Sequence, residues 1–343
     1  QFQSVLDSLY AQNPTAIGLM AHVEAPDRQL SWSGAAGFSD KTKASKLNPL
    51  QPLLIASNTK TYVSAAMLRL VEMGKVGLVM PIKGLISPKT EALMVKDGYQ
   101  LDSIKIVHLL SHTSGIFDYI LADTFFQVVA ADPKHRWTRD EQIGMGMTEG
   151  DPLAKPGETF QYADINYLLL TEVIEKQTGK PFYTAIRELL KYEQLGLNMT
   201  WFESLEEDRG ELVHQYASEI GIDSYEIDHS FDLYGGGGIA ATSKDLARFS
   251  QSLFEKKIFD KPETLDLIYT KVTTQDSAFS NYYLGLSGSK INGLQAYGHG
   301  GFWATAVHYI PELNASISVF VLDKDKGALR SDMMNELVGV LAE

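Results

Sequence analysis

The chain has 343 residues, of which 44% are hydrophobic and 21% are charged, as in ordinary globular proteins. Its net charge of −13 at pH 7 argues against nucleic acid and anionic membrane surfaces as partners, because both bind basic proteins. The absence of cysteine excludes thiol nucleophiles, disulfides and cysteine-bound zinc. No apolar run is long enough to span a bilayer, so we expect no transmembrane helix.

The first residues bear on the location of the protein. The chain begins at Gln1, without Met and without the apolar core of a signal peptide. A mature exported protein has such a start once its signal peptide is removed, and so does a shortened chain. We therefore expect a periplasmic or secreted protein, with the cytoplasm as the alternative. The sequence leaves the oligomeric state open.

In chain order, residues 15–40 predict a β-hairpin, because two apolar runs flank a turn at Pro26. Near the C-terminus, two more strands flank a turn at Pro311, and a helix over 330–343 ends the chain. Between these ends, apolar residues spaced three or four apart predict helices. The predicted helices are 57–73, 103–112, 164–178, 181–194 and 243–257.

These elements predict an α+β protein with a single domain over residues 1–343. Strands at both termini indicate an antiparallel sheet, flanked by helices, that is assembled from about 1–56 and 285–343. The mostly helical segment of about 57–284 would form an inserted subdomain. No repeat or linker separates the two parts, and a cleft between them is the expected place for a site.

Ser57 and Lys60 stand at the head of the helix predicted over 57–73. Residues three apart share one helix face, so these side chains are neighbours. Ser57 alone could be an N-cap, but a lysine in the first turn opposes the helix dipole. A serine nucleophile needs a base, and burial and the dipole both favour a neutral Lys60 that could act as one. The backbone N–H of Ser57 could also bind a developing oxyanion.

A second Ser-x-x-Lys pattern, from Ser287 to Lys290, provides a comparison. About one such match is expected by chance in a chain of this size. The glycines around this copy fit a turn rather than the start of a helix. We therefore interpret it as the chance match.

Two further segments offer partners for the serine. Tyr162 comes just before the helix predicted over 164–178, where an isolated tyrosine is more often a core or rim aromatic. His299, Gly300 and Gly301 enter a predicted strand, and glycines let a substrate approach a strand backbone closely. The alternative for these three residues is a strand bulge with a structural histidine.

Three short segments together resemble the motif set of the serine β-lactamase-related family. The branch in question holds class C β-lactamases, D-alanyl-D-alanine carboxypeptidases, D-aminopeptidases and related esterases. The resemblance covers the chain in order from about residue 15 to 325, and the family's fold agrees with the one predicted above. The three segments are Ser57-Asn58-Thr59-Lys60, Tyr162-Ala163-Asp164 and His299-Gly300-Gly301, with supporting matches at 108–116, 155–182 and 234–254.

The resemblance implies catalytic roles for named residues. Ser57 is similar to the family's acylated nucleophile, and Lys60 to the amine beside it. Tyr162 resembles the tyrosine that passes a proton to the leaving group and activates the deacylating water. The backbone N–H of Phe302 would complete the oxyanion hole with that of Ser57.

The resemblance also implies that His299, Gly300, Gly301 and Asp164 bind substrate, with two departures from the usual pattern. His299 stands where many relatives carry lysine, and a neutral histidine weakens any fixed positive charge for a substrate carboxylate. Asp164 stands where the motif usually has Asn, and an ionised Asp only accepts hydrogen bonds. Both departures argue against efficient β-lactam hydrolysis. Asp164 predicts a preference for substrates with an amino group or without an acylamino group, unless it only caps the following helix.

Two other patterns suggest no further chemistry. His108 and His112 have the i, i+4 spacing of a zinc pair but lack the Glu of H-E-x-x-H and a third ligand, so we expect no metal and no other cofactor. The glycine run 235–238 is not a P-loop, because no Gly-Lys-Ser/Thr follows it. We interpret this run as support for the cleft or as a tight turn.

The leading functional hypothesis is a metal-free serine hydrolase that forms an acyl-enzyme. Its substrates would be small molecules or peptides: D-residue peptides, D-residue amides or small esters. A true class C-type β-lactamase is the alternative within the enzyme class. A non-catalytic protein that binds penicillin or peptidoglycan peptides is the alternative of another class, and the presence of Ser57, Lys60 and Tyr162 argues against it.

Overall fold

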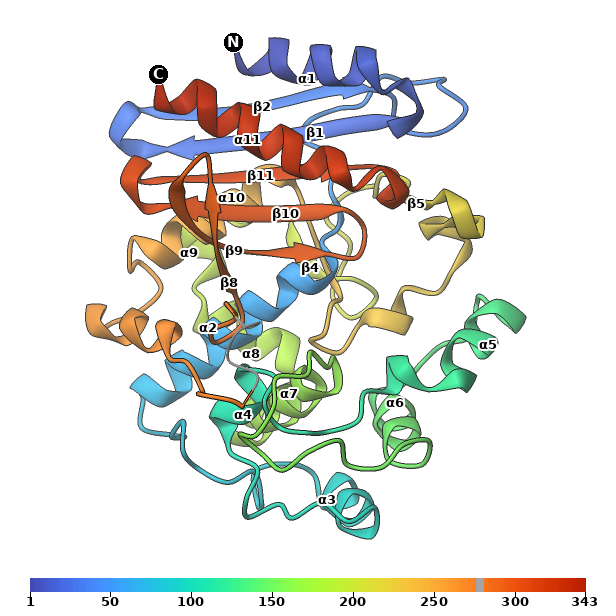
Figure 1. The fold of residues 1–343 in the computed structure, drawn as a ribbon, viewed down its shortest axis with the longest axis vertical. Helices are drawn as coiled ribbons and strands as arrows, with labels where there is room; N and C mark the ends of the chain where they lie inside the picture. The colour runs from blue at the N-terminus through green and yellow to red at the C-terminus, as the bar shows by residue number, and fades with distance from the viewer. Residues whose placement is uncertain (276–280) are drawn as a thin grey trace.

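The structure, a computed structural model, describes residues 1–275 and 281–343. Its main feature is a six-stranded antiparallel sheet with the strand order β2-β1-β11-β10-β9-β8. N- and C-terminal segments form this sheet together, as predicted, and Figure 1 shows the blue and red ends of the chain side by side. The strands are β1 (Gly18–Ala25), β2 (Leu30–Gly37), β8 (Ser287–Ile291), β9 (Leu294–Gly301), β10 (Thr305–Ile310) and β11 (Ala315–Val321).

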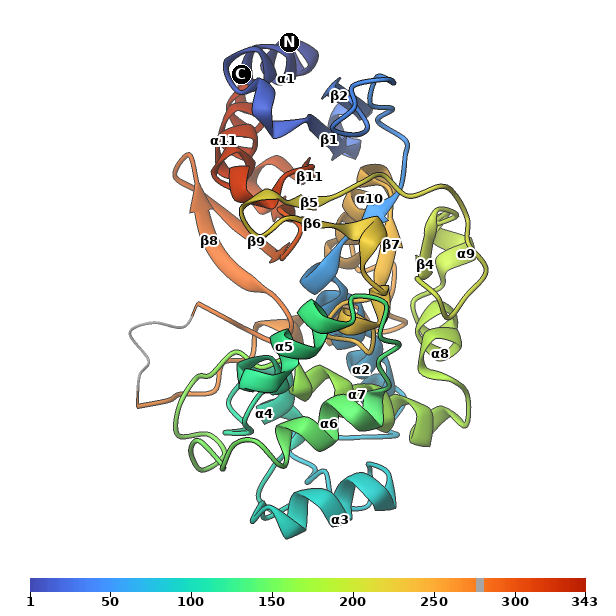
Figure 2. The ribbon, with the colours of Figure 1, turned by 90° about the vertical axis from the view of Figure 1, so that its right-hand side faces the viewer.

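Helices cover both faces of the sheet. Helices α1 (Phe2–Gln12) and α11 (Ala328–Ala342) pack on one face, and α10 (Ser243–Phe254) packs on the other (Figure 2). Strand β11 is buried along its whole length, because a helix layer covers each of its sides. Its apolar side packs with α11, and on the other side Ser316 and Ser318 form hydrogen bonds with α10. The α+β fold class is confirmed. The predicted boundary is not, since α10 lies inside the range 57–284 but belongs to the sheet layers.

The remaining helices form the lower part of the molecule in Figure 1. Helix α2 is its axis, and all residues from Thr59 to Leu70 are buried. The helices are α2 (Thr59–Glu72), α3 (Pro88–Lys96), α4 (Ile106–Leu110), α5 (Asp123–Ala131), α6 (Arg139–Gly146), α7 (Ile165–Thr178), α8 (Phe182–Leu189) and α9 (Tyr192–Leu195). Short strands join this part to the rest: β3 (Leu53–Leu54), β7 (Ile239–Ala241) and β4 (Thr200–Phe202) form one sheet, and β5 (Tyr216–Ala217) and β6 (Ile222–Asp223) another.

Local sequence explains where several predicted helices end. Helix α7 stops at Gly179, whose left-handed φ of +68° suits glycine. The helix predicted over 181–194 is two helices, because Lys191 is also left-handed, with a φ of +57°. The helix predicted over 103–112 shortens to α4. In the described ranges, no helix is long and apolar enough to cross a membrane.

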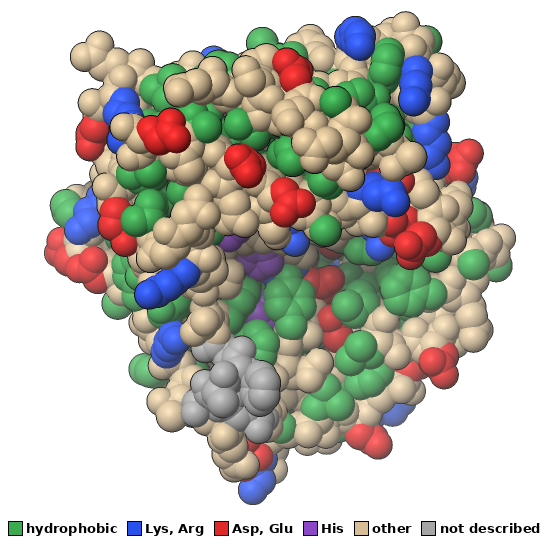
Figure 3. Space-filling view, turned by 45° about the horizontal axis from the view of Figure 1, so that its top comes forward, with side chains coloured by type: hydrophobic (Ala, Val, Ile, Leu, Met, Phe, Trp, Pro, Cys, Tyr) green, Lys and Arg blue, Asp and Glu red, His purple; other side chains and the backbone are tan. Residues whose placement is uncertain are grey.

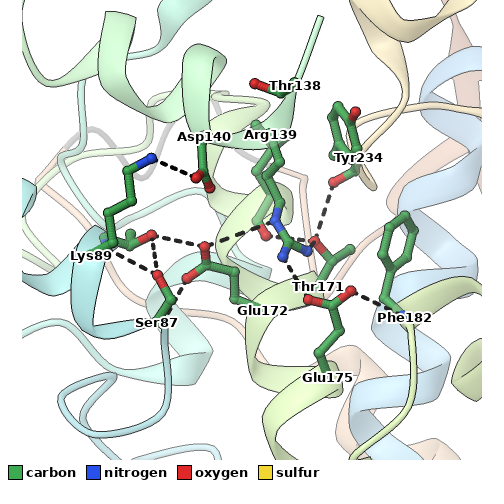
Figure 4. A network of polar contacts seen from close by, with 12 residues as sticks. Ser87, Lys89, Thr138, Arg139, Asp140, Thr171, Glu172, Glu175, Phe182 and Tyr234 are labelled. Atoms are coloured by element: carbon green, nitrogen blue, oxygen red, sulfur yellow. Dashed lines mark hydrogen bonds and ion pairs between the residues drawn. The ribbon is translucent and has the colours of Figure 1, made fainter.

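A buried polar cluster joins helices α3, α6 and α7 (Figure 4). Glu172, on α7, accepts hydrogen bonds from Ser87 N at 2.9 Å and from Thr90 Oγ1 at 2.8 Å. Arg139, on α6, pairs with Glu175 at 2.6 Å and lies 3.8 Å from Glu172. We call this group the Glu172 cluster. It fixes α7 in the helical part, so the start of α7 has a defined place beside α2.

Candidate active site

Ser57 lies in a short 3-10 helix, Ala56–Asn58, that leads directly into α2. Buried hydrogen bonds fix this turn to β10: Asn58 Nδ2 donates to Thr305 Oγ1 at 2.9 Å, and Thr305 Oγ1 donates to Ile55 O at 3.0 Å. Ala56, just before Ser57, has a φ of +47°. A left-handed non-glycine residue costs on the order of 1–3 kcal/mol and is retained where the surroundings impose it, often at functional sites.

Lys60 is completely buried, and its ammonium group has two hydrogen-bond acceptors and one ion-pair partner. Nζ lies 3.0 Å from Ser57 Oγ, 2.6 Å from Gly236 O and 2.5 Å from Asp164 Oδ1. Burial, the largest single effect, lowers the pKa of Lys60, but Asp164, Tyr162 and Asp232 together outweigh it and raise the pKa. The carboxylate beside Nζ favours the lysine cation over the neutral amine that burial and the dipole alone would favour. Two hydrogen-bond acceptors and a paired carboxylate are surroundings that suit a lysine cation.

Asp164 does not cap α7 with its side chain, although it occupies the N-cap position. The cap comes instead from Asp118, whose carboxylate oxygens accept from the N–H groups of Asp164 at 2.6 Å and Ile165 at 3.3 Å. Asp164 is thereby available to Lys60. Of its two predicted alternatives, the capping role is contradicted and the place beside Lys60 is found.

Two more carboxyl groups lie close to this ion pair, Asp118 and Asp232. Burial, together with the charge of Asp164, raises the pKa of Asp118 to about 7 and that of Asp232 to about 8. The glycine run lies against Asp164 and Asp232: a Cβ on Gly236 would come within 3.1 Å of Asp164 Cγ, and one on Gly237 within 2.2 Å of Asp232 Oδ2. Gly236 also offers its carbonyl to Lys60. Only glycines fit here, and the run lines the site.

Tyr162 is brought to the same place. Lys60 Nζ lies 4.9 Å from the centroid of its ring, and its hydroxyl interacts with both Lys60 and Ser57. Burial raises the pKa of Tyr162 to about 12, although the charge of Lys60 acts in the opposite direction. The phenol is therefore protonated at neutral pH.

His299 is buried and both of its ring nitrogens are engaged. A carbonyl only accepts, so Nδ1 donates to Gly300 O at 2.6 Å, and Nε2 then accepts from Tyr282 Oη at 3.0 Å. Burial and the charge of Lys60 lower the pKa of His299 to about 3. His299 is therefore neutral and offers no positive charge to a carboxylate, as its residue type suggests.

The end of β9 lies against the turn that holds Ser57. A Cβ on Gly301 would come within 2.5 Å of Ile55 O, so this approach requires glycine. Gly300 faces the opposite way, where a Cβ would meet Arg330 Nη1 at 2.9 Å. Any contact of Gly300 with a substrate would therefore be made by its backbone.

Among the described residues, no turn or loop hydrogen bond uses the backbone N–H of Ser57 or Phe302 as its donor. This leaves both available to an oxyanion.

The space above these residues is open to solvent. Figure 3 shows a hollow between the upper and lower parts of the molecule, with histidine side chains inside it and hydrophobic side chains around it. Ser57 itself is only partly buried. A substrate could therefore reach its hydroxyl.

Comparison with known proteins places this geometry in a family. A family model described as Beta-lactamase matches residues 6–338. The chain belongs to the Beta-lactamase family. The predicted resemblance is confirmed, and the strand-and-helix arrangement around Ser57 is this family's fold.

Individual relatives of the chain are distant. Penicillin-binding protein 4* of Bacillus subtilis is 24% identical over 240 residues, which cover 66% of this chain and 50% of that protein. The D-alanyl-D-alanine-carboxypeptidase/endopeptidase AmpH of Escherichia coli is 25% identical over 307 residues, 84% of this chain and 76% of that protein. The chain spans about half the length of the first of these curated relatives.

Among solved structures, D-amino acid amidase from Ochrobactrum anthropi SV3, complexed with L-phenylalanine amide, is similar over 100% of this chain and 98% of its own. The TM-score is 0.81 and the identity is 20%. At this identity the likeness shows the fold.

Against this family background, four residues of the site were missed by sequence reasoning: Asp118, Asp232, Gly236 and Tyr282. Tyr282 lies edge-on to the rings of His112 and His299, at 4.9 Å and 5.7 Å between centroids. No local pattern marked Asp118, Asp232 or Tyr282. The glycine run was noted only as support for the cleft or a turn.

The two histidines at zinc-pair spacing each use one ring nitrogen as a hydrogen-bond acceptor. His112 Nδ1 accepts a hydrogen bond from Ala163 N at 3.1 Å, and His108 Nδ1 accepts one from Lys105 N at 3.2 Å. Both nitrogens therefore serve the backbone. Over residues 1–275 and 281–343, no group of three or more His, Asp or Glu side chains is arranged to hold a metal ion.

The second Ser-x-x-Lys copy differs from the first in structure. Ser287 and Lys290 lie on strand β8, not in the predicted turn. Residues three apart on a strand point to opposite faces. The Ser287 hydroxyl donates to Gly298 O at 3.2 Å, so this copy lacks the arrangement found at Ser57.

Proposed function

We propose that this chain is a serine hydrolase that forms an acyl-enzyme on Ser57. The observation that carries the proposal is the contact of Ser57 Oγ with Lys60 Nζ at 3.0 Å, beside the hydroxyl of Tyr162. A hydroxyl, an amine and a phenol in mutual contact supply the nucleophile and the proton carriers for acyl transfer. The N–H groups of Ser57 and Phe302 would bind the developing oxyanion.

The charge state of Lys60 suggests how the proton moves. The lysine cation donates to Ser57 Oγ, so the hydroxyl hydrogen of Ser57 points elsewhere, and Tyr162 is the other polar partner of that hydroxyl. As Ser57 attacks the carbonyl carbon, its proton passes to the Tyr162 oxygen, and the Tyr162 proton passes to the leaving amine or alcohol. Water then takes the place of the leaving group and reverses these transfers. Lys60 stabilises the negative charge that develops on both oxygens.

For the substrate, we place D-amino-acid amides and D-residue peptides first and small esters next. The similar amidase and the AmpH relative are named for D-amino acid amides and D-alanyl-D-alanine peptides, respectively. Asp164 adds a reason, because a carboxylate at the acyl side would attract an amino group and repel a neutral N-acyl carbonyl. A periplasmic or secreted location suits such substrates and is part of the proposal.

Intact-mass analysis tests the proposal. The protein is exposed to a fluorophosphonate, a β-lactam, a D-amino acid amide and a panel of small esters. Adducts that form on the wild type but not on Ser57→Ala support the nucleophile. A β-lactam that is rapidly turned over would favour the β-lactamase alternative. Absence of any adduct, with β-lactam binding retained, would favour the non-catalytic binder.

A metal-removal arm completes this test. The proposed transfers use only side chains and backbone N–H groups, so hydrolysis should survive exhaustive treatment with EDTA. Loss of activity that zinc restores would contradict the mechanism.

A further inference from the structure

His112 holds the backbone on both sides of Tyr162. Its carbonyl oxygen accepts from Gln161 N at 2.8 Å, and its Nδ1 accepts from Ala163 N at 3.1 Å. Its ring is also stacked on the Tyr162 ring, with the centroids 4.2 Å apart. His112 is fully buried and has a left-handed φ of +55°. A non-glycine residue keeps such a backbone only when its surroundings enforce it.

Asp118 holds the next part of the same segment. Its two carboxylate oxygens accept from the N–H groups of Asp164 and Ile165, which begin α7 and have no acceptor within the helix. The Asp164 side chain is therefore left to reach Lys60 Nζ, at 2.5 Å. Asp118 is fully buried, so its carboxylate has little freedom to move.

We propose that His112 and Asp118 are positioning residues for the acyl-transfer site. His112 sets the place of Tyr162, and Asp118 sets the place of Asp164 against Lys60. This inference rests on the proposed function and concerns the same site. It has measurable consequences, because a misplacement of about 1 Å in a reacting group can cost about 100-fold in rate.

Paired substitutions separate the two contributions of His112. His112→Phe keeps a stacking ring and loses the Nδ1 acceptor. His112→Asn loses the ring but can still accept from the Ala163 N–H through its amide oxygen. His108→Phe is the matched control, because His108 also accepts from a backbone N–H, that of Lys105, at the start of its own helix. Asp118→Asn removes one of the two oxygens that accept at the start of α7.

The measurement is steady-state hydrolysis of a small ester without an amino group. We expect kcat to fall by about 10- to 100-fold in His112→Phe and Asp118→Asn, with KM within about threefold of wild type. His112→Asn should recover part of the loss, and His108→Phe should stay within about twofold. Equal effects of His108→Phe and His112→Phe, or losses confined to KM, would overturn the proposal. If His112→Phe does not fold, His112→Asn and Asp118→Asn test the proposal by the same comparison of kcat with KM.

Labelling and hydrogen exchange separate failure of this inference from failure of the proposed function. If a fluorophosphonate labels Ser57 equally fast in wild type and variants, and kcat is unchanged, the function stands and the positioning role is wrong. If even the wild type is neither labelled nor active, the proposed function fails. In that case, amide hydrogen exchange over residues 161–165 tests the positioning role without any need for activity. Faster exchange in His112→Phe and Asp118→Asn than in His108→Phe supports the positioning role, and unchanged exchange refutes it.

Discussion

Helix α7 carries two carboxylates in contrasting surroundings. Glu172 receives hydrogen bonds from Ser87 N and Thr90 Oγ1 and lies near a guanidinium (Figure 4). Asp164, at the start of the same helix, has only the cation of Lys60 among the groups that the structure describes. A carboxylate whose oxygens are satisfied by several donors is held in place and is inert. One that is paired with a single cation controls the charge of that cation, which is a property useful for catalysis.

The contrast is also one of charge balance. In the Glu172 cluster, donors from three segments surround the acids. Around Lys60, three carboxyl groups share one cation, and two of them, Asp118 and Asp232, have raised pKa values of about 7 and about 8. The first arrangement stabilises the helical part of the fold. The arrangement around Lys60 instead keeps an excess of carboxyl groups over cations at the site of the proposed chemistry. The predictions below separate these two outcomes, stability and turnover.

The largest effect is expected from Ser57→Ala. This substitution removes the nucleophile, and the loss of a nucleophile can cost several orders of magnitude in kcat. The melting temperature should stay close to that of wild type, because Ser57 is only partly buried. Ester and D-amino acid amide hydrolysis, with a melting curve, provide the measurement. Ser287→Ala is the control and should be close to wild type, so near-normal turnover by Ser57→Ala would refute the assignment.

The next largest effect is expected from Tyr162→Phe. The substitution keeps the ring that stacks on His112 and removes only the hydroxyl. General acid–base catalysis contributes about 10²- to 10⁴-fold, and kcat should fall within that range while KM changes little. Steady-state kinetics on an activated ester and on an amide measure this. A change in KM alone would make Tyr162 a wall of the binding site and leave proton transfer to Lys60.

A stability effect is expected at the other carboxylate of α7. Glu172→Ala removes the carboxylate that lies 3.8 Å from Arg139. It also leaves the Ser87 N–H without its acceptor. Arg139 keeps its pair with Glu175, so the main cost is that of the unsatisfied buried donors, about 1–3 kcal/mol of unfolding free energy. Denaturant unfolding measures it, with the exposed Glu336→Ala, on α11, as control. The kcat of the folded fraction should stay near wild type, and a selective loss of kcat would instead connect this cluster to the site.

Sequence alone could predict the part of the site that is local. Ser57 and Lys60 are one turn apart at the start of a helix, so their contact follows from helix geometry. Tyr162 and His299 were found through the order of motifs in a family, not through local physics. Asp118 could not be found, because its hydrogen bond to Asp164 joins residues 46 positions apart. That contact depends on tertiary packing.

The fold was predictable to a similar depth. The terminal strands have clear apolar patterns around Pro26 and Pro311, and they pair as predicted. Burial and the helix dipole taken alone favour a neutral Lys60, whereas the Asp164 carboxylate beside it favours the protonated form. The groups that oppose burial, with Asp164 at 2.5 Å the strongest of them, are brought beside Lys60 only by the folded structure.

The smallest predicted effect concerns substrate ranking, and it tests what the Asp164 carboxylate does beyond its pairing with Lys60. Asp164→Asn removes the negative charge and restores the amide that relatives carry. The substitution also changes the charge balance of Lys60, which alters the rate for every substrate. The ratio of kcat/KM for a D-amino acid amide to that for an ester without an amino group cancels this common effect.

A charge-assisted hydrogen bond contributes about 1.5–3 kcal/mol, so the ratio should fall by about 10- to 100-fold in Asp164→Asn if the carboxylate binds the substrate amino group. N-acyl-D-peptides and β-lactams should gain relative to the ester. Both amide and ester are measured at one pH, so that the ionisation of the substrate amine is constant. An unchanged ratio would restrict Asp164 to its role beside Lys60, and the carboxylate would then set the charge of the lysine without selecting the substrate.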